Sequence, residues 1–163
     1  MKALRKGLIV AVIQMLLVTM VGAKLLVDRS RYPQVWVQTA PYDPDSPLRG
    51  RYVRLLAVVE SQGRFDDPNV YEQPGRLLVR GNSLVAVRDD NGPVYFTKNS
   101  CGDQDCLTLT EPLAFFIPEH VKDPSIRAGD EQLWVKVTVP PRGLPRPIEL
   151  GVKKNGNLTP LKF

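Results

Sequence analysis

Residues 7–27 read GLIVAVIQMLLVTMVGAKLLV, and the only charged residue among them is Lys24. At 1.5 Å of rise per residue, a helix over this stretch would be roughly 30 Å long, the thickness of one hydrocarbon core. A helix in the core of a soluble protein needs a polar face, and this stretch lacks one. Lys24 lies near one end, where its side chain can reach the lipid headgroups. The stretch therefore predicts a transmembrane helix in contact with lipid, and residues 1–27 are expected to be a signal anchor.

Basic residues flank the apolar stretch on both sides. Lys2, Arg5 and Lys6 precede it. Arg29 and Arg31 follow it, together with the acidic Asp28. A short basic head favours an N-terminus on the cytoplasmic side of the membrane. We therefore expect a single-pass protein of the cytoplasmic (inner) membrane. Residues 28–32 would be a short tether, and residues 33–163 a domain on the periplasmic or extracellular side.

A cleaved signal peptide is the alternative interpretation of the N-terminus. Gly22 and Ala23 are small residues of the kind that precede a cleavage site, so a cut after Ala23 would release a secreted protein. The apolar stretch is long for a signal peptide, and residues 25–27 continue it beyond that site. Both interpretations export the same domain.

Charge and proline content limit the class of the exported domain. The chain has 163 residues, which suits one domain, with 22 basic and 17 acidic residues. Four of the basic residues and none of the acidic ones precede residue 28, so the remainder is nearly neutral and nucleic-acid binding is not expected. All 15 prolines lie at or beyond Pro33, which argues against a helical bundle.

Apolar and polar residues alternate along two segments near the C-terminus. Residues 133–139 and 148–153 each place apolar side chains on one face, the pattern of a half-buried strand. Asn155-Gly156 is a hairpin signal leading to a further strand over residues 158–161. Pro160 restricts that last strand to the edge of a sheet because it has no N–H group to donate.

Further strands are expected upstream, where β-branched and aromatic residues gather between turn signals. They cover residues 35–39, 52–60, 83–88, 94–98 and 107–110. Residues 89–93 (DDNGP) indicate a hairpin between two of these strands, and residues 118–122 could form one helical turn. The chain is thus expected to have an N-terminal transmembrane helix followed by an all-β domain, either an antiparallel sandwich or a small barrel.

Three blocks of the chain resemble the GDYXXLXY family of small membrane-anchored prokaryotic proteins. The blocks cover residues 39–55, 116–119 and 133–153. Within the family motif Gly50, Tyr52 and Leu55 match, whereas Arg51 stands in place of Asp and Ala57 in place of the final Tyr. The resemblance implies a membrane-tethered, exported β-domain, and it implies no particular biochemical activity.

The motif region itself predicts a turn that leads into a core strand. In that strand Val53, Leu55, Ala57 and Val59 would share one face, and Tyr52, Arg54, Leu56 and Val58 the other. Arg49, Arg51 and Arg54 form a candidate basic rim. Such a rim could attract anionic headgroups by about 1 kcal/mol per charge.

Cys101 and Cys106 are the only cysteines of the chain and form a candidate disulfide. A structural zinc site needs four ligands, and His120 is the only histidine. The spacing is also not the C-x-x-C of redox enzymes. In an oxidising compartment the pair would staple the loop between two strands, and neither a metal nor a cofactor is expected.

Catalytic residues are hard to assign in this sequence. His120 has no G-x-S-x-G element to accompany it, so a Ser–His–Asp triad is not expected. A membrane-anchored Ser–Lys hydrolase is the enzymatic alternative, and Lys98 and Ser100 would point to the same side of one strand. The favoured hypothesis is a non-enzymatic accessory or binding module whose partner is an integral membrane protein or an envelope component.

The N-terminus of the mature protein distinguishes the anchor from the signal peptide. We expect N-terminal sequencing of protein from the membrane fraction to begin at Met1, and a sequence beginning at Lys24 would contradict the anchor.

The orientation of the domain can be tested by digestion. Protease added to intact cells should degrade the domain, whereas inverted vesicles should protect it. The reverse pattern of digestion would overturn the expected orientation.

Overall fold

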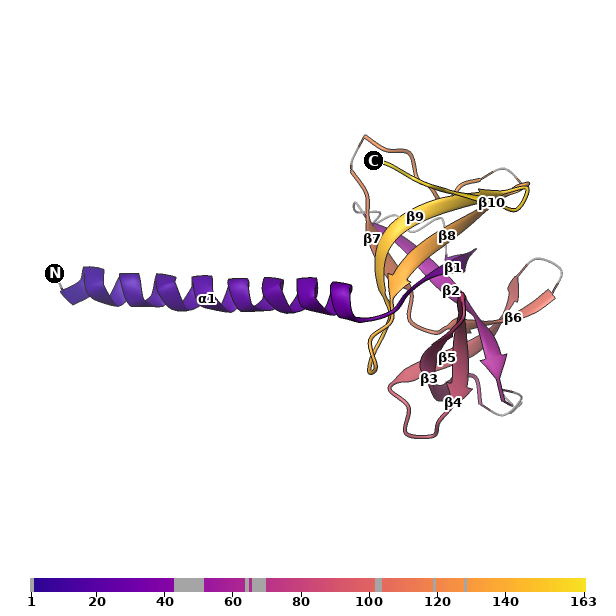
Figure 1. Cartoon of the computed structure of the whole chain (residues 1–163), viewed down its shortest axis with the longest axis horizontal. Coiled ribbons are helices and arrows are strands. Elements are labelled where there is room, and N and C mark those ends of the chain that lie inside the picture. Colours follow the sequence, from indigo (N-terminus) through magenta and orange to yellow (C-terminus); the bar gives the residue numbers. More distant parts are fainter. Residues whose placement is uncertain are drawn as a thin grey trace. The chain divides into compact units, whose positions relative to one another are not determined.

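The computed structural model describes residues 2–42, 52–63, 65, 70–101, 104–118, 120–127 and 129–163. The chain divides into two compact units, residues 1–32 and residues 33–163 (Figure 1). The first unit contains α1 (Lys2–Arg31). The strands of the second unit are β1 (Gln34–Pro41), β2 (Tyr52–Gln62), β3 (Gln73–Arg80), β4 (Ser83–Arg88), β5 (Val94–Cys101), β6 (Gln104–Leu109), β7 (Leu113–Phe116), β8 (Glu131–Thr138), β9 (Arg146–Lys154) and β10 (Asn157–Pro160). The predicted combination of one N-terminal helix and an all-β domain is confirmed.

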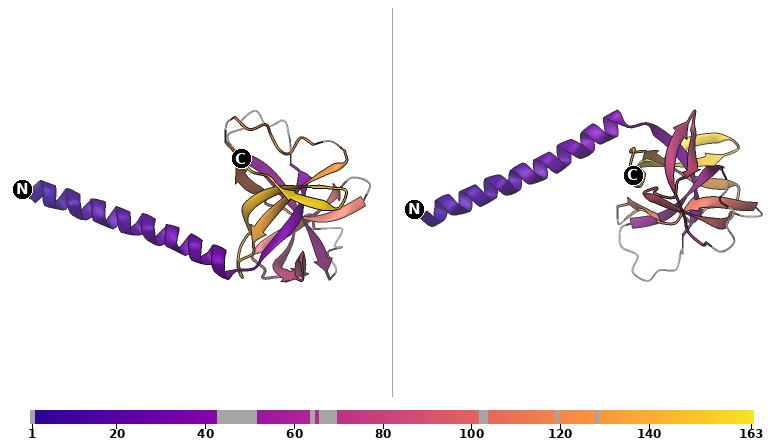
Figure 2. Two further views of the ribbon diagram at one scale, coloured as in Figure 1. Left: turned by 45° about the horizontal axis from the view of Figure 1, so that its top comes forward. Right: turned by 90° about the horizontal axis from the view of Figure 1, so that it is seen from below.

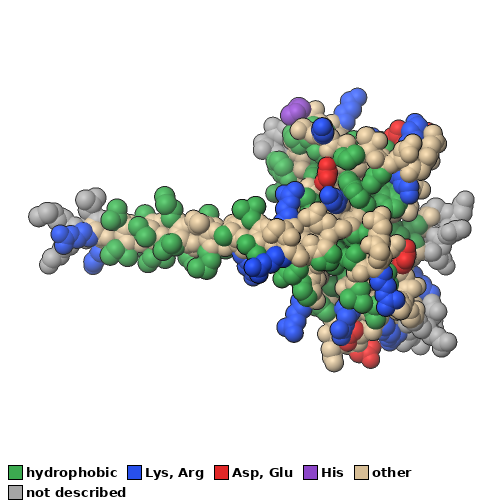
Figure 3. Space-filling model, viewed as in Figure 1, with side chains coloured by type: hydrophobic (Ala, Val, Ile, Leu, Met, Phe, Trp, Pro, Cys, Tyr) green, Lys and Arg blue, Asp and Glu red, His purple; other side chains and the backbone are tan. Residues whose placement is uncertain are grey.

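The helix α1 is long and apolar enough over Arg5–Arg31 to cross a membrane. Apolar side chains cover its middle, with basic groups toward both ends (Figure 3). Residues 28–32, expected to be a tether, are helical as far as Arg31. The N–H of Tyr32 still donates to the carbonyl of Asp28 at 3.1 Å. Pro33 ends the helix because the residue before a proline is driven out of the helical conformation.

The strands form one sheet that joins two parts through β1 and β2. The order of strands is β10-β9-β8-β1-β2-β4-β3-β5-β6, and β7 pairs with β2 beside this path. A further pairing of β2 with β6 closes β2, β4, β3, β5 and β6 into a ring. Figure 1 shows β8–β10 and β3–β5 at opposite ends of the second unit, and Figure 2 shows its twisted strands from two more directions. The second unit therefore combines a small barrel with an antiparallel layer made of β1, β8, β9 and β10.

The alternation predicted for β2 is confirmed. Val53, Leu55, Ala57 and Val59 are all buried and belong to one hydrophobic core. Tyr52 and Arg54, on the other face, are exposed. This single core runs through both parts of the sheet, because it includes residues of the barrel and of the antiparallel layer.

The hairpin predicted at residues 89–93 is wrong as a pairing, although the chain does turn there. β4 and β5 are not neighbours, because β3 lies between them and Gly75 pairs with both Arg88 and Val94. The Asn91 N–H donates to the Asp89 carboxylate at 3.2 Å and closes the turn. Gly92 passes so close to β3 that an added Cβ would lie 2.1 Å from the carbonyl oxygen of Gly75. The turn residues were recognisable, but the strand that separates β4 from β5 was not.

Two other local expectations concern turns. The Asn155-Gly156 hairpin is confirmed, with φ of 49° and 83° at the two residues, as the tight turn requires. Pro160 lies in β10, which stands at one end of the sheet order, so the predicted edge position is confirmed too. Over residues 118–122 the described part holds a single hydrogen bond, from Val121 N–H to the Pro118 carbonyl at 3.1 Å, and no helix.

The disulfide between Cys101 and Cys106 is present, with 5.7 Å between the two Cα atoms. It joins the end of β5 to β6. β5 and β6 are neighbouring strands of the ring, so the disulfide crosslinks the two strands on either side of a short loop, as predicted.

Replacement of Leu55 by Ala should strongly destabilise the protein. Leu55 is only 1% exposed, and loss of such a side chain costs about 2–5 kcal/mol in free energy of unfolding. Leu78 is 40% exposed, so Leu78→Ala serves as the matched control with an expected cost of about 0.5 kcal/mol. Urea unfolding of the full chain in detergent would measure both, and equal costs would contradict the assigned core.

Removal of the disulfide should have a smaller effect. Because the closed loop is short, the chain-entropy model predicts a loss of about 2 kcal/mol for the double variant Cys101→Ser/Cys106→Ser. Thiol titration of the unreduced protein isolated from membranes should find neither cysteine free. Two reactive thiols would contradict both the staple and an oxidising location.

Candidate functional site

The family-motif residues fall into two groups in the structure. Gly50, Arg49 and Arg51 lie outside the described residues, so the basic rim stays a prediction. Leu55 is buried, whereas Tyr52 is 58% exposed and its ring makes an edge-on contact with Phe116, 5.6 Å between centroids. The motif thus supplies one core residue and one surface aromatic residue.

The Lys98–Ser100 pair of the hydrolase hypothesis stays a prediction, because only part of it is described. Lys98 is exposed on β5, and the side chain of Ser100 lies outside the described set. His120 is exposed in a turn. Ser125 is engaged by the Asp123 carboxylate, to which its hydroxyl donates at 2.6 Å. Ser83, the first residue of β4, lines a groove.

That groove has a volume of about 440 Å³, in the range that binding sites use, and we call it the fork groove. It is lined by Trp36, Val37, Gln38, Val58, Val59, Glu60, Asn82, Ser83, Leu84, Trp134, Lys153, Gly156 and Leu158. These residues come from β1, β2, β4, β8, β9, β10 and two turns, all within the second unit. Both tryptophans of the chain belong to it.

The groove exists because two strands compete for the same edge of β2. β7 and β6 pair with one edge of β2, and β1 and β4 pair with the other. β1 ends its pairing at Thr39↔Ala57, and β4 begins at Glu60↔Val85. Continuing the β1 register would bring Trp36 opposite Glu60, which already has a partner in β4. β1 therefore diverges from β2 at this point, and the space between the diverging strands is the fork groove.

Two tryptophans with different surroundings stand in the groove. The ring of Trp36 closes over Gly151, where an added Cβ would lie 3.0 Å from its Cζ3 atom. The ammonium of Lys153 lies 4.5 Å from the ring centroid of Trp134, a cation–π contact. The indole Nε1 of Trp134 is buried and has no hydrogen-bond acceptor within the described part of the chain. A buried donor without an acceptor is unfavourable, so this N–H is a candidate for a ligand or a water molecule.

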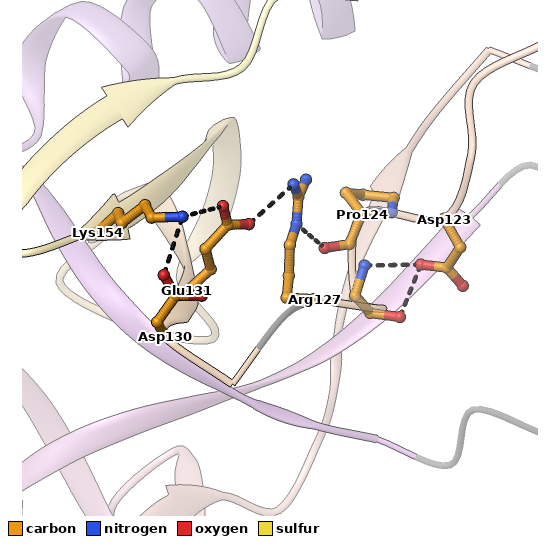
Figure 4. A network of polar contacts seen from close by, with 7 residues as sticks. Asp123, Pro124, Arg127, Asp130, Glu131 and Lys154 are labelled. Atoms are coloured by element: carbon orange, nitrogen blue, oxygen red, sulfur yellow. Dashed lines mark hydrogen bonds and ion pairs between the residues drawn. The ribbon is translucent and has the colours of Figure 1, made fainter.

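Lys153 differs from its neighbour Lys154 in its ionic contacts. The ammonium of Lys154 binds Asp130 at 2.9 Å and Glu131 at 3.3 Å (Figure 4). These contacts lower the pKa of Asp130 and raise the pKa of Lys154. Arg127 extends the network, because its Nε donates to the Pro124 carbonyl at 2.9 Å and its guanidinium lies 3.7 Å from Glu131. The network ties the segment before β8 to β9, whereas Lys153 meets no carboxylate among the described residues.

The second notable hollow lies between β7 and the β8–β9 loop. It measures about 410 Å³ and its lining includes four prolines, Pro112, Pro140, Pro145 and Pro147. Arg142, Arg146 and Glu111 add charge to its wall. It lacks aromatic side chains, so the fork groove is the stronger candidate for recognition.

Metal chemistry finds no support among the residues that the structure describes. No group of three or more His, Cys, Asp or Glu side chains there could hold a metal ion.

In comparisons with protein-family models, curated proteins and solved structures, nothing matches this chain. The resemblance to the GDYXXLXY family therefore stays a prediction.

Proposed function

We propose that this protein is a membrane-anchored binding module that recognises an integral membrane protein or an envelope component through the fork groove. In this proposal α1 is retained as a single-pass anchor in the cytoplasmic membrane with its N-terminus inside. The β-domain then lies on the periplasmic or extracellular side. Membership of the GDYXXLXY family is part of the same proposal.

The fork groove is the observation that carries the proposal. A soluble domain gains stability by covering apolar surface and strand edges, yet here two tryptophans and the edge of β1 line an open groove. Trp is among the residues most enriched at the centres of binding sites. A partner that fills the groove would explain why this surface is kept open.

The expected compartment is supported by two independent features. The Cys101–Cys106 disulfide is typical of oxidising compartments, which lie outside the cytoplasm. The basic residues that precede the apolar helix favour a cytoplasmic N-terminus. Both features are satisfied when the β-domain is exported.

A Ser–Lys hydrolase is the second candidate, because Ser83 and Lys153 line the same groove. A lysine that acts as a general base must lie within hydrogen-bond reach of the hydroxyl that it deprotonates. Lys153 lies over the Trp134 ring, and no hydrogen bond joins it to Ser83 in the described structure. These contacts favour binding over hydrolysis.

Crosslinking in native membranes tests the proposal. Asn82 lines the fork groove, and Asn91 lies in the turn at the opposite end of β4 and does not. We expect the wild-type chain to form a discrete adduct, Asn82→Arg to reduce its yield at least fivefold because the new side chain fills the groove, and Asn91→Arg to leave it unchanged. Equal yields from both variants, or recovery of uncrosslinked monomer only, would contradict a role for the groove.

A serine-directed activity probe separates the two candidates in the same membranes. The binding module should remain unlabelled. Labelling that is abolished by Ser83→Ala or by Ser100→Ala would establish the hydrolase in its place.

A further inference from the structure

We infer that the occupant of the fork groove is an extended peptide segment, which adds as a strand to the free edge of β1 and places an acidic side chain beside Lys153. This inference rests on the proposed function and deepens it, because it states which chemistry the partner presents.

The lining of the groove identifies its walls as strand edges. Successive side chains of a strand point to opposite faces of a sheet, so a ligand lying on a face would touch every second residue. Here the lining includes the consecutive residues 36–38 of β1, 58–60 of β2 and 82–84 at the start of β4. Runs of consecutive residues mean that backbone N–H and C=O groups take part in the walls.

The ladder between β1 and β8 shows which backbone groups of β1 point into the groove. The Val139 N–H donates to the Pro33 carbonyl at 3.0 Å, so this pair is hydrogen-bonded. In an antiparallel ladder, hydrogen-bonded and non-hydrogen-bonded pairs alternate. In the register of β1 with β8, Val37↔Val135 is then hydrogen-bonded and Trp36↔Lys136 is not. The N–H and C=O of Trp36 therefore point away from β8.

Nothing in the described sheet pairs with that side of Trp36. The pairing of β1 with β2 covers Thr39, Ala40 and Pro41, and stops before Trp36. An added strand would receive one hydrogen bond from the N–H of Trp36 and donate one to its C=O. This is the geometry by which extended peptides bind to exposed sheet edges.

A peptide suits the groove better than a saccharide does. A sugar would stack on an open indole face, but the Lys153 ammonium already lies over the ring of Trp134. Trp36 is closed on one side by Gly151. The two indoles therefore act as walls beside a backbone, and the free Trp36 edge supplies the directional contacts.

The groove is lined by one basic and one acidic residue, Lys153 and Glu60, and the surroundings of Lys153 favour an acidic peptide residue at its end of the groove. The Lys153 ammonium has a π-face beneath it and no carboxylate beside it in the described structure. A Glu or Asp side chain of the peptide would supply that carboxylate. Lys136 lies two residues after Trp134 on the same face of β8 and does not line the groove, so it provides a control lysine.

Intrinsic tryptophan fluorescence reports on this groove alone, because both tryptophans of the chain line it. The probe is a pool of random hexapeptides, free of Trp and with Glu at the third position, presented to the full chain in nanodiscs. We expect individual hexapeptides to be enriched over empty nanodiscs and to shift the fluorescence. N-methylation of alternate peptide amides should weaken binding at least tenfold, because it removes the donors that a strand needs. Lys153→Gln should weaken binding several-fold and Lys136→Gln should not.

Amide hydrogen exchange provides a readout that is specific for strand addition. On binding of an enriched hexapeptide, the N–H of Trp36 should become protected. The N–H of Val37, which already faces β8, should not change. Protection of neither amide, or tolerance of N-methylation, would overturn strand addition.

The outcomes also separate this inference from the proposed function. If no hexapeptide is enriched while chitotetraose shifts the fluorescence, the peptide inference is wrong and the binding module stands. If crosslinking also fails to distinguish Asn82→Arg from Asn91→Arg, the proposed function is wrong as well. Enrichment of peptides whose binding is lost in Asn82→Arg supports both.

Discussion

Each edge of a β-strand can hold one neighbour at a time, and the fold of this domain follows from that limit at β2. One edge of β2 pairs with β7 and then β6, and the other with β1 and then β4. From Glu60 onward β4 pairs with this second edge, so β1 diverges from β2 there. The antiparallel layer and the barrel separate there while remaining joined by one core. The fork groove is the space left by this exchange of partners.

A small residue, Ala57, occupies a buried position at the point of exchange. Ala57 is fully buried where β1 ends its pairing with β2. It occupies the position at which the GDYXXLXY motif has tyrosine, and a phenol there would have to displace packed neighbours. The buried Leu55 and the exposed Tyr52 need no such adjustment.

The sequence was informative where structure is local. Period-two alternation located β2, β8 and β9, and Asn155-Gly156 located a hairpin, because these patterns depend on near neighbours. β3 has a weak sequence signal, because Pro74 and Gly75 follow its first residue and lower its strand propensity. The wrong β4–β5 pairing has the same origin, since a strand that inserts between two others leaves no signal in the turn joining them. No local pattern in the sequence indicates the fork groove, because Trp36, Ser83 and Trp134 are brought together only by the topology of the sheet. The presence of both tryptophans in alternating strands was the single available hint.

The pairing of β1 with β8 has a consequence for how the protein is made. β1 is the first strand after the helix, yet its partner β8 follows roughly 100 residues later. The ring likewise stays open until β6 has been synthesised. Contacts of such high sequence separation form slowly. During synthesis, residues 34–38 of β1 therefore have no partner strand until β8 has been made, and the domain completes its fold only when almost the whole polypeptide is available.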